Sequence, residues 1–251
     1  MSIDRGPVDA LTGRARELWE LLAGAAAGFT PSMSAAVSPG SYLCPPGWAG
    51  IVVLGDAALA TAPDHDTARI IEQALGDLAL AAIADGGVLI SRLPAAEILG
   101  PAALAYLDPA EFRAQPGEAL TAPVSLDDPG VRQFVAAADA NDVAESGIEE
   151  ISTPAFAVRE YGRVVAAAGY RNWPCDTAHL SVLTASAARG RGRARAAASA
   201  AVAHAVEQGM LPQWRARPPA SRRVARALGF RELGFQVSIR LAALDASMRD
   251  A

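Results

Sequence analysis

The segment HLSVLTASAARGRGRARAAASAAVAH, residues 179–204, is the most informative part of this sequence for predicting its fold. Its pattern predicts a short apolar strand over residues 180–184, a turn, an arginine- and glycine-rich run over residues 189–194, and a long alanine-rich helix. A strand that leads through a glycine-rich turn into a helix directs unpaired N–H groups, and the positive end of the helix dipole, toward one place. That place favours an anion, most naturally a phosphate.

Glycine and arginine alternate in this run. Gly190 and Gly192 lack the Cβ atoms that would hold a diphosphate away from the backbone, while the arginines between them add positive charge. A solvated run of charge is the alternative interpretation, but the alternation at the start of a helix favours phosphate binding. Small residues then recur along one helical face and predict packing against a sheet: Ala194, Ala197, Ala198, Ala201, Val202, Ala205 and Val206.

The composition of the whole chain limits the function further. Its 251 residues suit one large domain or two modest ones, and we favour two. The formal net charge of −5 opposes bulk attraction to nucleic acid, so a local basic patch suits a small anionic ligand better. Cys44 and Cys175 are too few for a disulfide framework and lack metal-ligand spacing. The sequence shows neither a signal-peptide pattern nor a membrane-spanning apolar run, so we expect a cytoplasmic protein with no metal and no membrane partner.

The first half of the chain predicts a compact αβ unit. We expect a helix over residues 8–24, a loop to Gly50, a hairpin of residues 51–54 and 57–61, a helix over 67–83, a buried strand over 88–91 and a helix from Pro94. Between Phe112 and Asp128 the composition shifts to Pro, Gly, Glu and Asp. We place the boundary there, which gives an N-terminal αβ domain of residues 1–115 and a second domain of residues 116–251.

The second half predicts a different order of elements. Two helical segments over residues 131–138 and 139–146 precede a hairpin of residues 154–159 and 163–170. After the central strand and helix follow a strand over 213–217, a helix over 219–228 that Gly229 ends, and a half-buried strand over 235–241.

Two motifs in this half carry a family resemblance. Arg189-x-x-Gly192-x-Ala194 after the central strand resembles the Gln/Arg-x-x-Gly-x-Gly/Ala signature of the GNAT acyltransferase superfamily. The helix from Pro218 to Phe230 resembles the closing helix of that family, which reads Asn-x-x-Ser, an apolar stretch and Leu-Gly-Phe; here Ser221 and Leu228-Gly229-Phe230 match. The resemblance implies an α+β GNAT fold with a mixed, splayed sheet, preceded by a smaller αβ domain that could be a degenerate GNAT-like copy.

The resemblance also implies a function and a set of site residues. Acetyl-CoA would lie in the V-shaped gap of the sheet as co-substrate, and its acetyl group would pass directly to an amine of a small molecule, a protein or a peptide. The backbone of Val182, Leu183 and Thr184 would pair with the pantetheine arm, and Ser221 would contact the coenzyme from the other side. The pyrophosphate would be held by the amides of Arg189, Gly190, Arg191, Gly192, Arg193 and Ala194.

Two departures from the family pattern bear on activity. Pro218 stands where the family has asparagine, and Ala225 stands where a tyrosine often serves as general acid. For the proton of the acceptor amine, the candidate catalytic residues are Glu149, Glu150 and His179, against a solvated acidic turn and a structural histidine as the alternatives. Glu145, on the preceding predicted helix, is a candidate proton acceptor on the same grounds as Glu149 and Glu150, with a solvated side chain as the alternative.

Other functions stay open at this point. Of the arginines 222, 223 and 226, one could reach a ribose phosphate, while the others face water. A catalytically impaired CoA-binding or regulatory module is the first alternative, and a nucleic-acid-binding protein using residues 189–195 is the second. The acidic total charge and the lack of aromatic residues within that run oppose the second alternative, so we expect no nucleic-acid partner. The sequence leaves a homodimer open.

Overall fold

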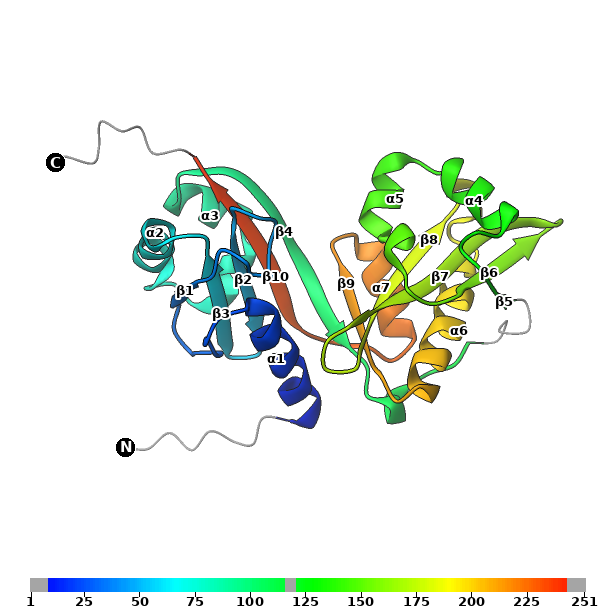
Figure 1. The fold of residues 1–251 in the computed structure, drawn as a ribbon, viewed down its shortest axis with the longest axis horizontal. Helices are drawn as coiled ribbons and strands as arrows, with labels where there is room; N and C mark the ends of the chain where they lie inside the picture. The colour runs from blue at the N-terminus through cyan, green and yellow to red at the C-terminus, as the bar shows by residue number, and fades with distance from the viewer. Residues whose placement is uncertain (1–8, 116–120, 243–251) are drawn as a thin grey trace. The chain divides into compact units, whose positions relative to one another are not determined.

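The computed structural model of the chain describes residues 9–115 and 121–242. The chain divides into two compact units, one of Met1–Leu104 with Leu233–Ala251 and one of Ala105–Glu232 (Figure 1). The last strand, β10 (Arg231–Leu241), was expected with the second half, but nearly all of it lies in the first unit. The reason is its pairing, because Gly234 to Ile239 run antiparallel to β2 (Ala49–Leu54).

The first unit contains a strand core covered by short helices. Strand β2 forms the expected hairpin with β3 (Ala57–Ala62), and β1 (Ala35–Val37) pairs in parallel with β3, within a stretch that we expected to be loop. Helix α1 (Ala10–Ala23) is also as expected, with Leu18 and Trp19 fully buried. Helices α2 (His65–Leu75) and α3 (Gly86–Arg92) contribute Ile71, Leu75 and Leu89 to one apolar core with β2 and β10.

Three expectations for this unit were wrong. The helix expected over residues 67–83 ends at Leu75, where Gly76 interrupts it, and a short 3-10 helix, η1 (Leu80–Ala84), follows. Residues 88–91 are helical, because the Asp85 side chain accepts hydrogen bonds from the amides of Gly87 and Val88 and so starts a helix where we expected one to end. After Pro94 the chain forms strand β4 (Ala95–Tyr106), because pairing beside β10 overrides the local helical pattern.

The second unit contains a mixed sheet in the order β9-β8-β7-β6-β5. Its strands are β5 (Thr121–Val124), β6 (Ala155–Glu160), β7 (Arg163–Trp173), β8 (Thr177–Thr184) and β9 (Leu211–Ala216). Neighbouring strands from β5 to β8 are antiparallel, whereas β8 and β9 are parallel. The expected α+β class with a mixed sheet is therefore confirmed, and so is the hairpin of β6 and β7.

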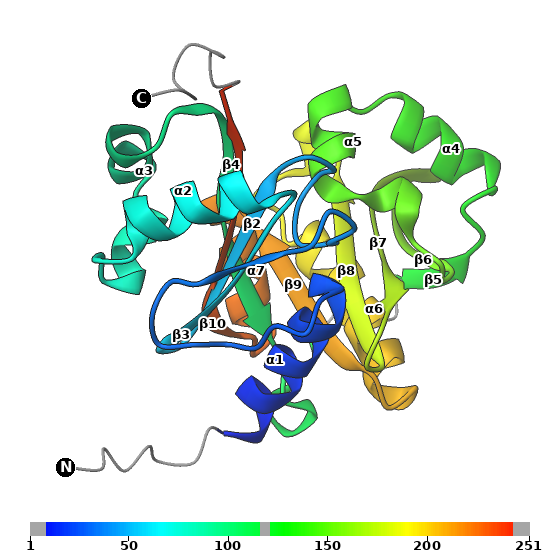
Figure 2. The same cartoon turned by 60° about the vertical axis from the view of Figure 1, so that its left-hand side comes forward.

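Helices cover both faces of this sheet (Figure 2). Helix α6 (Arg193–Glu207) packs on one face, where Ala197, Ala201 and Ala205 are fully buried, together with α7 (Pro219–Ala227). Helix α4 (Pro129–Ala136), helix α5 (Ala140–Ser146) and the 3-10 helix η4 (Ile148–Glu150) lie on the opposite face. The expected packing of a small-residue face against a sheet is confirmed, because alanine side chains let the α6 backbone approach the strands closely.

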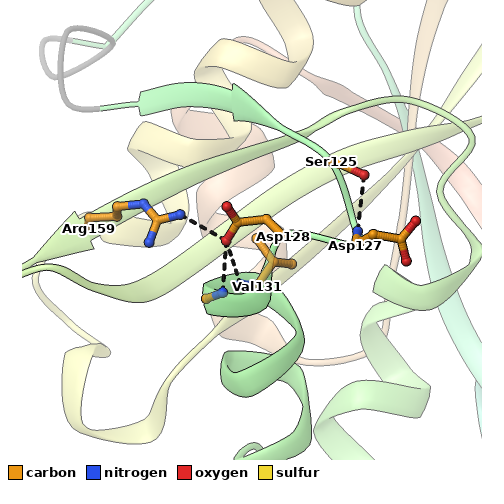
Figure 3. A network of polar contacts seen from close by, with 6 residues as sticks. Ser125, Asp127, Asp128, Val131 and Arg159 are labelled. Carbon is orange, nitrogen blue, oxygen red and sulfur yellow. Dashed lines mark hydrogen bonds and ion pairs between the residues drawn. The ribbon is translucent and has the colours of Figure 1, made fainter.

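Asp128 anchors helix α4 to strand β6 of the sheet (Figure 3). Its carboxylate accepts hydrogen bonds from the amides of Gly130 and Val131 and pairs with Arg159 of β6 at 3.0 Å. The Arg159 hydrogen bond is the main reason why the pKa of Asp128 lies below its usual value. Next to it, the Ser125 hydroxyl accepts from the Asp127 amide and shapes the turn before the helix.

Candidate functional site

Strands β8 and β9 separate after a short stretch of pairing. They pair in parallel only at Thr177–Leu211, Ala178–Pro212 and His179–Gln213. Beyond His179, residues 180–184 of β8 pair with β7 on their other side. The sheet therefore opens between the end of β8 and the end of β9, and it exposes backbone groups that an extended ligand can pair with.

A cavity of about 550 Å³ occupies this opening. It is bounded by β8, β9, the loop before α6 and one face of α7, with α5 at one side. Every residue that the resemblance placed against the coenzyme lines it except Arg191: Val182, Leu183, Thr184, Arg189, Gly190, Gly192, Arg193, Ala194 and Ser221. The tertiary structure thus brings three separate segments of the sequence around one space.

The loop before α6 presents main-chain amides to this cavity. Gly190 and Gly192 both have φ +76°, in the left-handed region that favours glycine. Gly192 is the N-cap of α6 and its position carries no side-chain cap, while the first bond of the helix runs from the Ala196 amide to the Gly192 carbonyl. The amides of residues 190–195 donate no hydrogen bond within the described part of the chain, so they can bind an anion.

The arginines of the loop are used differently from the sequence-based expectation. Arg189 pairs with Asp142 of α5 at 2.5 Å, and Arg193 pairs with Glu160 of β6 at 2.5 Å. Arg191 is exposed and does not line the cavity. The cation over the loop is Arg195, whose Nη2 lies 3.8 Å from the place of a Cβ on Gly192. Sequence reasoning missed Arg195 because its position inside the first helical turn gives no motif signal.

The α7 side of the cavity contains Ser221 and Trp214. The Trp214 indole donates a hydrogen bond of 3.0 Å to the Ser221 hydroxyl, which fixes that hydroxyl at the wall. Pro218 also lines the cavity. Ala225, at the position of the family's frequent tyrosine, is 2% exposed and packs in the core behind the wall. No proton donor reaches the cavity from that position.

The α5 side of the cavity carries carboxylates. Glu145 and Asp142 both line it, and Glu145 forms an ion pair with Arg217 just after β9. The Glu145 hydrogen bond is the main reason why the pKa of Arg217 is raised. The Thr184 hydroxyl, in the β8 wall, is buried and has no hydrogen-bond partner in the described structure. A bound ligand could supply that partner.

The predicted catalytic residues lie outside this cavity. Glu149 lines a second cavity beside α4 and α5, and Glu150 forms an exposed ion pair of 2.9 Å with Arg171. His179 stacks on Trp173 with ring centroids 4.0 Å apart and hydrogen-bonds to Gln213. Burial, and then the charge of Arg215, lower the pKa of His179 to about 3, so its imidazole is neutral at physiological pH. Of the glutamates considered from the sequence, only Glu145 lines the cavity between β8 and β9.

Within the described residues, no group of three or more His, Cys, Asp or Glu side chains is arranged to hold a metal ion. The helices of residues 9–115 and 121–242 likewise include none with both the length and the apolar character needed to cross a membrane.

Several solved structures and one family model are similar to this chain. Similar solved structures include a GNAT-family protein from Novosphingobium aromaticivorans (21% identity over 58% of this chain and 65% of that chain, TM-score 0.44). A second is a GCN5-related N-acetyltransferase from Kribbella flavida (18% identity over 61% of this chain and 62% of that chain, TM-score 0.44). A third is a GNAT-family acetyltransferase from Colwellia psychrerythraea (13% identity over 73% of this chain and 76% of that chain, TM-score 0.48).

The chain spans less than two thirds of the length of the first two of these structures. No curated protein matches this sequence. The family model described as GNAT acetyltransferase matches residues 154–234, from β6 through β8, the glycine loop, α6, β9 and α7. This part of the chain is therefore a GNAT acetyltransferase domain.

Proposed function

We propose that the chain is an acetyl-CoA-dependent N-acetyltransferase that moves an acetyl group directly to an amine. The observation that carries this proposal is the opening between β8 and β9, which continues into the unpaired amides of residues 190–195. An extended arm that ends in a diphosphate matches such a site, because the open edge of β8 offers pairing groups and the helix start receives the phosphates.

The transfer itself needs few groups from the protein. The amine nitrogen attacks the thioester carbonyl, a C–N bond forms, the C–S bond breaks and the coenzyme leaves as a thiolate. The amine must lose a proton, and the thiolate, with a thiol pKa of about 8.5, can leave without full protonation. Because Ala225 is buried and has no acidic proton, its position supplies no general acid. This lack should lower the rate of transfer less than the lack of a proton acceptor would.

We assign the acceptor side of the cavity to the wall formed by α5. Glu145 presents a carboxylate there, and a bound amine would have to share this carboxylate with Arg217 in order to be attracted to it and to pass its proton to it. His179 lies outside the cavity, and the low pKa of its imidazole makes it a weak proton acceptor, so we do not assign that proton to it. Glu149 and Glu150 lie outside the cavity, so we no longer propose them as proton acceptors.

The test is to mix the purified protein with acetyl-CoA and a panel of small and peptide amines and to measure the release of free thiol. Amine-dependent thiol release that Glu145→Gln lowers at least about tenfold supports the proposal. Control variants are Glu149→Gln and Glu150→Gln, which should retain turnover because both side chains lie outside the cavity. Calorimetric binding of CoA without turnover for any amine would favour the non-catalytic module instead.

A further inference from the structure

Helix α7 carries Arg222, Arg223 and Arg226, and these three side chains lie on two different faces of the helix. Ala220, Arg223, Val224 and Ala227 recur at the spacing of one helical face, and all four line the cavity. Arg222 and Arg226 lie on another face and share Glu232 at 2.5 and 3.5 Å. The Arg222 hydrogen bond to that carboxylate is the main reason why the pKa of Glu232 is lowered.

Arg223 differs from its neighbours in having no internal partner. Among the described residues it forms no ion pair and no hydrogen bond, although it is exposed at the cavity wall. Several other arginines around the cavity are neutralised by carboxylates: Arg189 by Asp142, Arg193 by Glu160 and Arg217 by Glu145. An unpaired guanidinium whose helical face points into a ligand cavity is arranged to bind an anion.

The cavity therefore offers two separate anion-binding subsites. The first is the glycine loop with its open amides and Arg195, which suits a diphosphate. The second is Arg223 on α7, and its neighbours Ala220 and Ala227 are small, so a bulky group can lie beside it. Val224 adds an apolar surface on the same face.

We infer that Arg223 binds the ribose phosphate of the acyl donor and so selects a 3′-phosphorylated coenzyme over its dephosphorylated form. This inference rests on the proposed function, because it concerns the same donor. The inference goes beyond the proposed function because it names the side chain that binds a second phosphate, distinct from the diphosphate at the loop. The guanidinium supplies two parallel N–H donors to phosphate oxygens, a geometry that an amide or hydroxyl cannot reproduce.

The experiment is calorimetric titration of the full chain with CoA and with 3′-dephospho-CoA. We expect the wild-type protein to bind CoA about tenfold more tightly than dephospho-CoA, as a charge-assisted phosphate contact provides. Arg223→Ala should weaken CoA binding about tenfold, down to the affinity for dephospho-CoA, and leave dephospho-CoA binding unchanged. Arg223→Lys should keep part of the preference. Arg226→Ala, on the same helix but paired with Glu232 outside the cavity, should keep all of it.

The possible failures are distinguishable. If wild-type protein binds CoA and dephospho-CoA equally, the inference is overturned while the proposed donor stands. The inference is also overturned if Arg223→Ala weakens both ligands alike, since Arg223 then acts on another part of the coenzyme. If the wild-type protein binds neither ligand, the proposed function fails together with the inference. Melting curves that match wild type show that each variant is folded, as an exposed side chain leads us to expect.

Discussion

Replacing Gly192 should separate two effects, backbone strain and electrostatic repulsion of the donor. Gly192 has φ +76° and ψ 4° and begins α6. A Cβ at this position would meet only the Arg195 guanidinium, at 3.8 Å, so an added side chain fits sterically. Gly162, in the turn between β6 and β7, is a matched control, with φ +78° and open space around its Cβ position.

The expected magnitudes differ for the two effects. An alanine in the left-handed region costs about 1–2 kcal/mol, so Gly192→Ala and Gly162→Ala should lower the free energy of unfolding by similar amounts. A glutamate at position 192 also places a negative charge beside the diphosphate. At roughly 5 Å and an effective dielectric constant of about 40, each pair of charges repels by about 2 kcal/mol. The affinity for CoA should therefore fall by more than about tenfold.

The assay combines urea unfolding with calorimetric titration of CoA for Gly192→Ala, Gly192→Gln, Gly192→Glu, Gly162→Ala and Gly162→Glu. Gly192→Gln has the size of glutamate without its charge, so the difference between these two variants isolates repulsion, and that difference should shrink in high salt. Gly162→Glu should lose stability but bind CoA as wild type does. A folded Gly192→Glu variant with wild-type affinity would refute the assignment of the diphosphate to this loop.

Three further predictions follow from named contacts. Asp142→Asn should raise the affinity for CoA about threefold, because this carboxylate lines the cavity and neutralises Arg189 at 2.5 Å; weaker binding in the same titration would contradict this. His179→Asn should reduce the loss of stability on acidification between about pH 6.5 and pH 3, because the native pKa is lowered to about 3 and the unfolded chain takes up the proton first. Urea unfolding at pH 7 and pH 5 measures this, and an equal drop in both proteins would count against it. Gly229→Ala should cost about 3 kcal/mol or more, since φ is +100° and the Cβ would overlap the Glu111 carbonyl oxygen; a loss no larger than that of Gly162→Ala would show that the chain shifts to accommodate it.

Sequence reasoning succeeded where local rules decide the structure. The glycine loop and α6 follow from left-handed glycines and from 3.6-residue periodicity, and the β6–β7 hairpin follows from its turn. It failed at residues 88–91 and after Pro94, because a cap by Asp85 and pairing beside β10 gave those segments the opposite structure from the one expected. Apolar runs of this length are ambiguous between helix and strand until their neighbours are known.

The linear pattern alone predicts that a glycine-rich loop leads into a helix packed on a sheet, and it contains the two motifs that resemble the family. These features depend on backbone conformation and on residues close together in the chain, so a linear pattern contains them. Tertiary contacts set the point where β8 and β9 separate, bring Glu145 rather than Glu149 or Glu150 to the cavity, and leave only some of the arginines unpaired. Those outcomes depend on contacts between segments far apart in the chain, such as that of Arg193 with Glu160, and such contacts leave no local signal in the sequence.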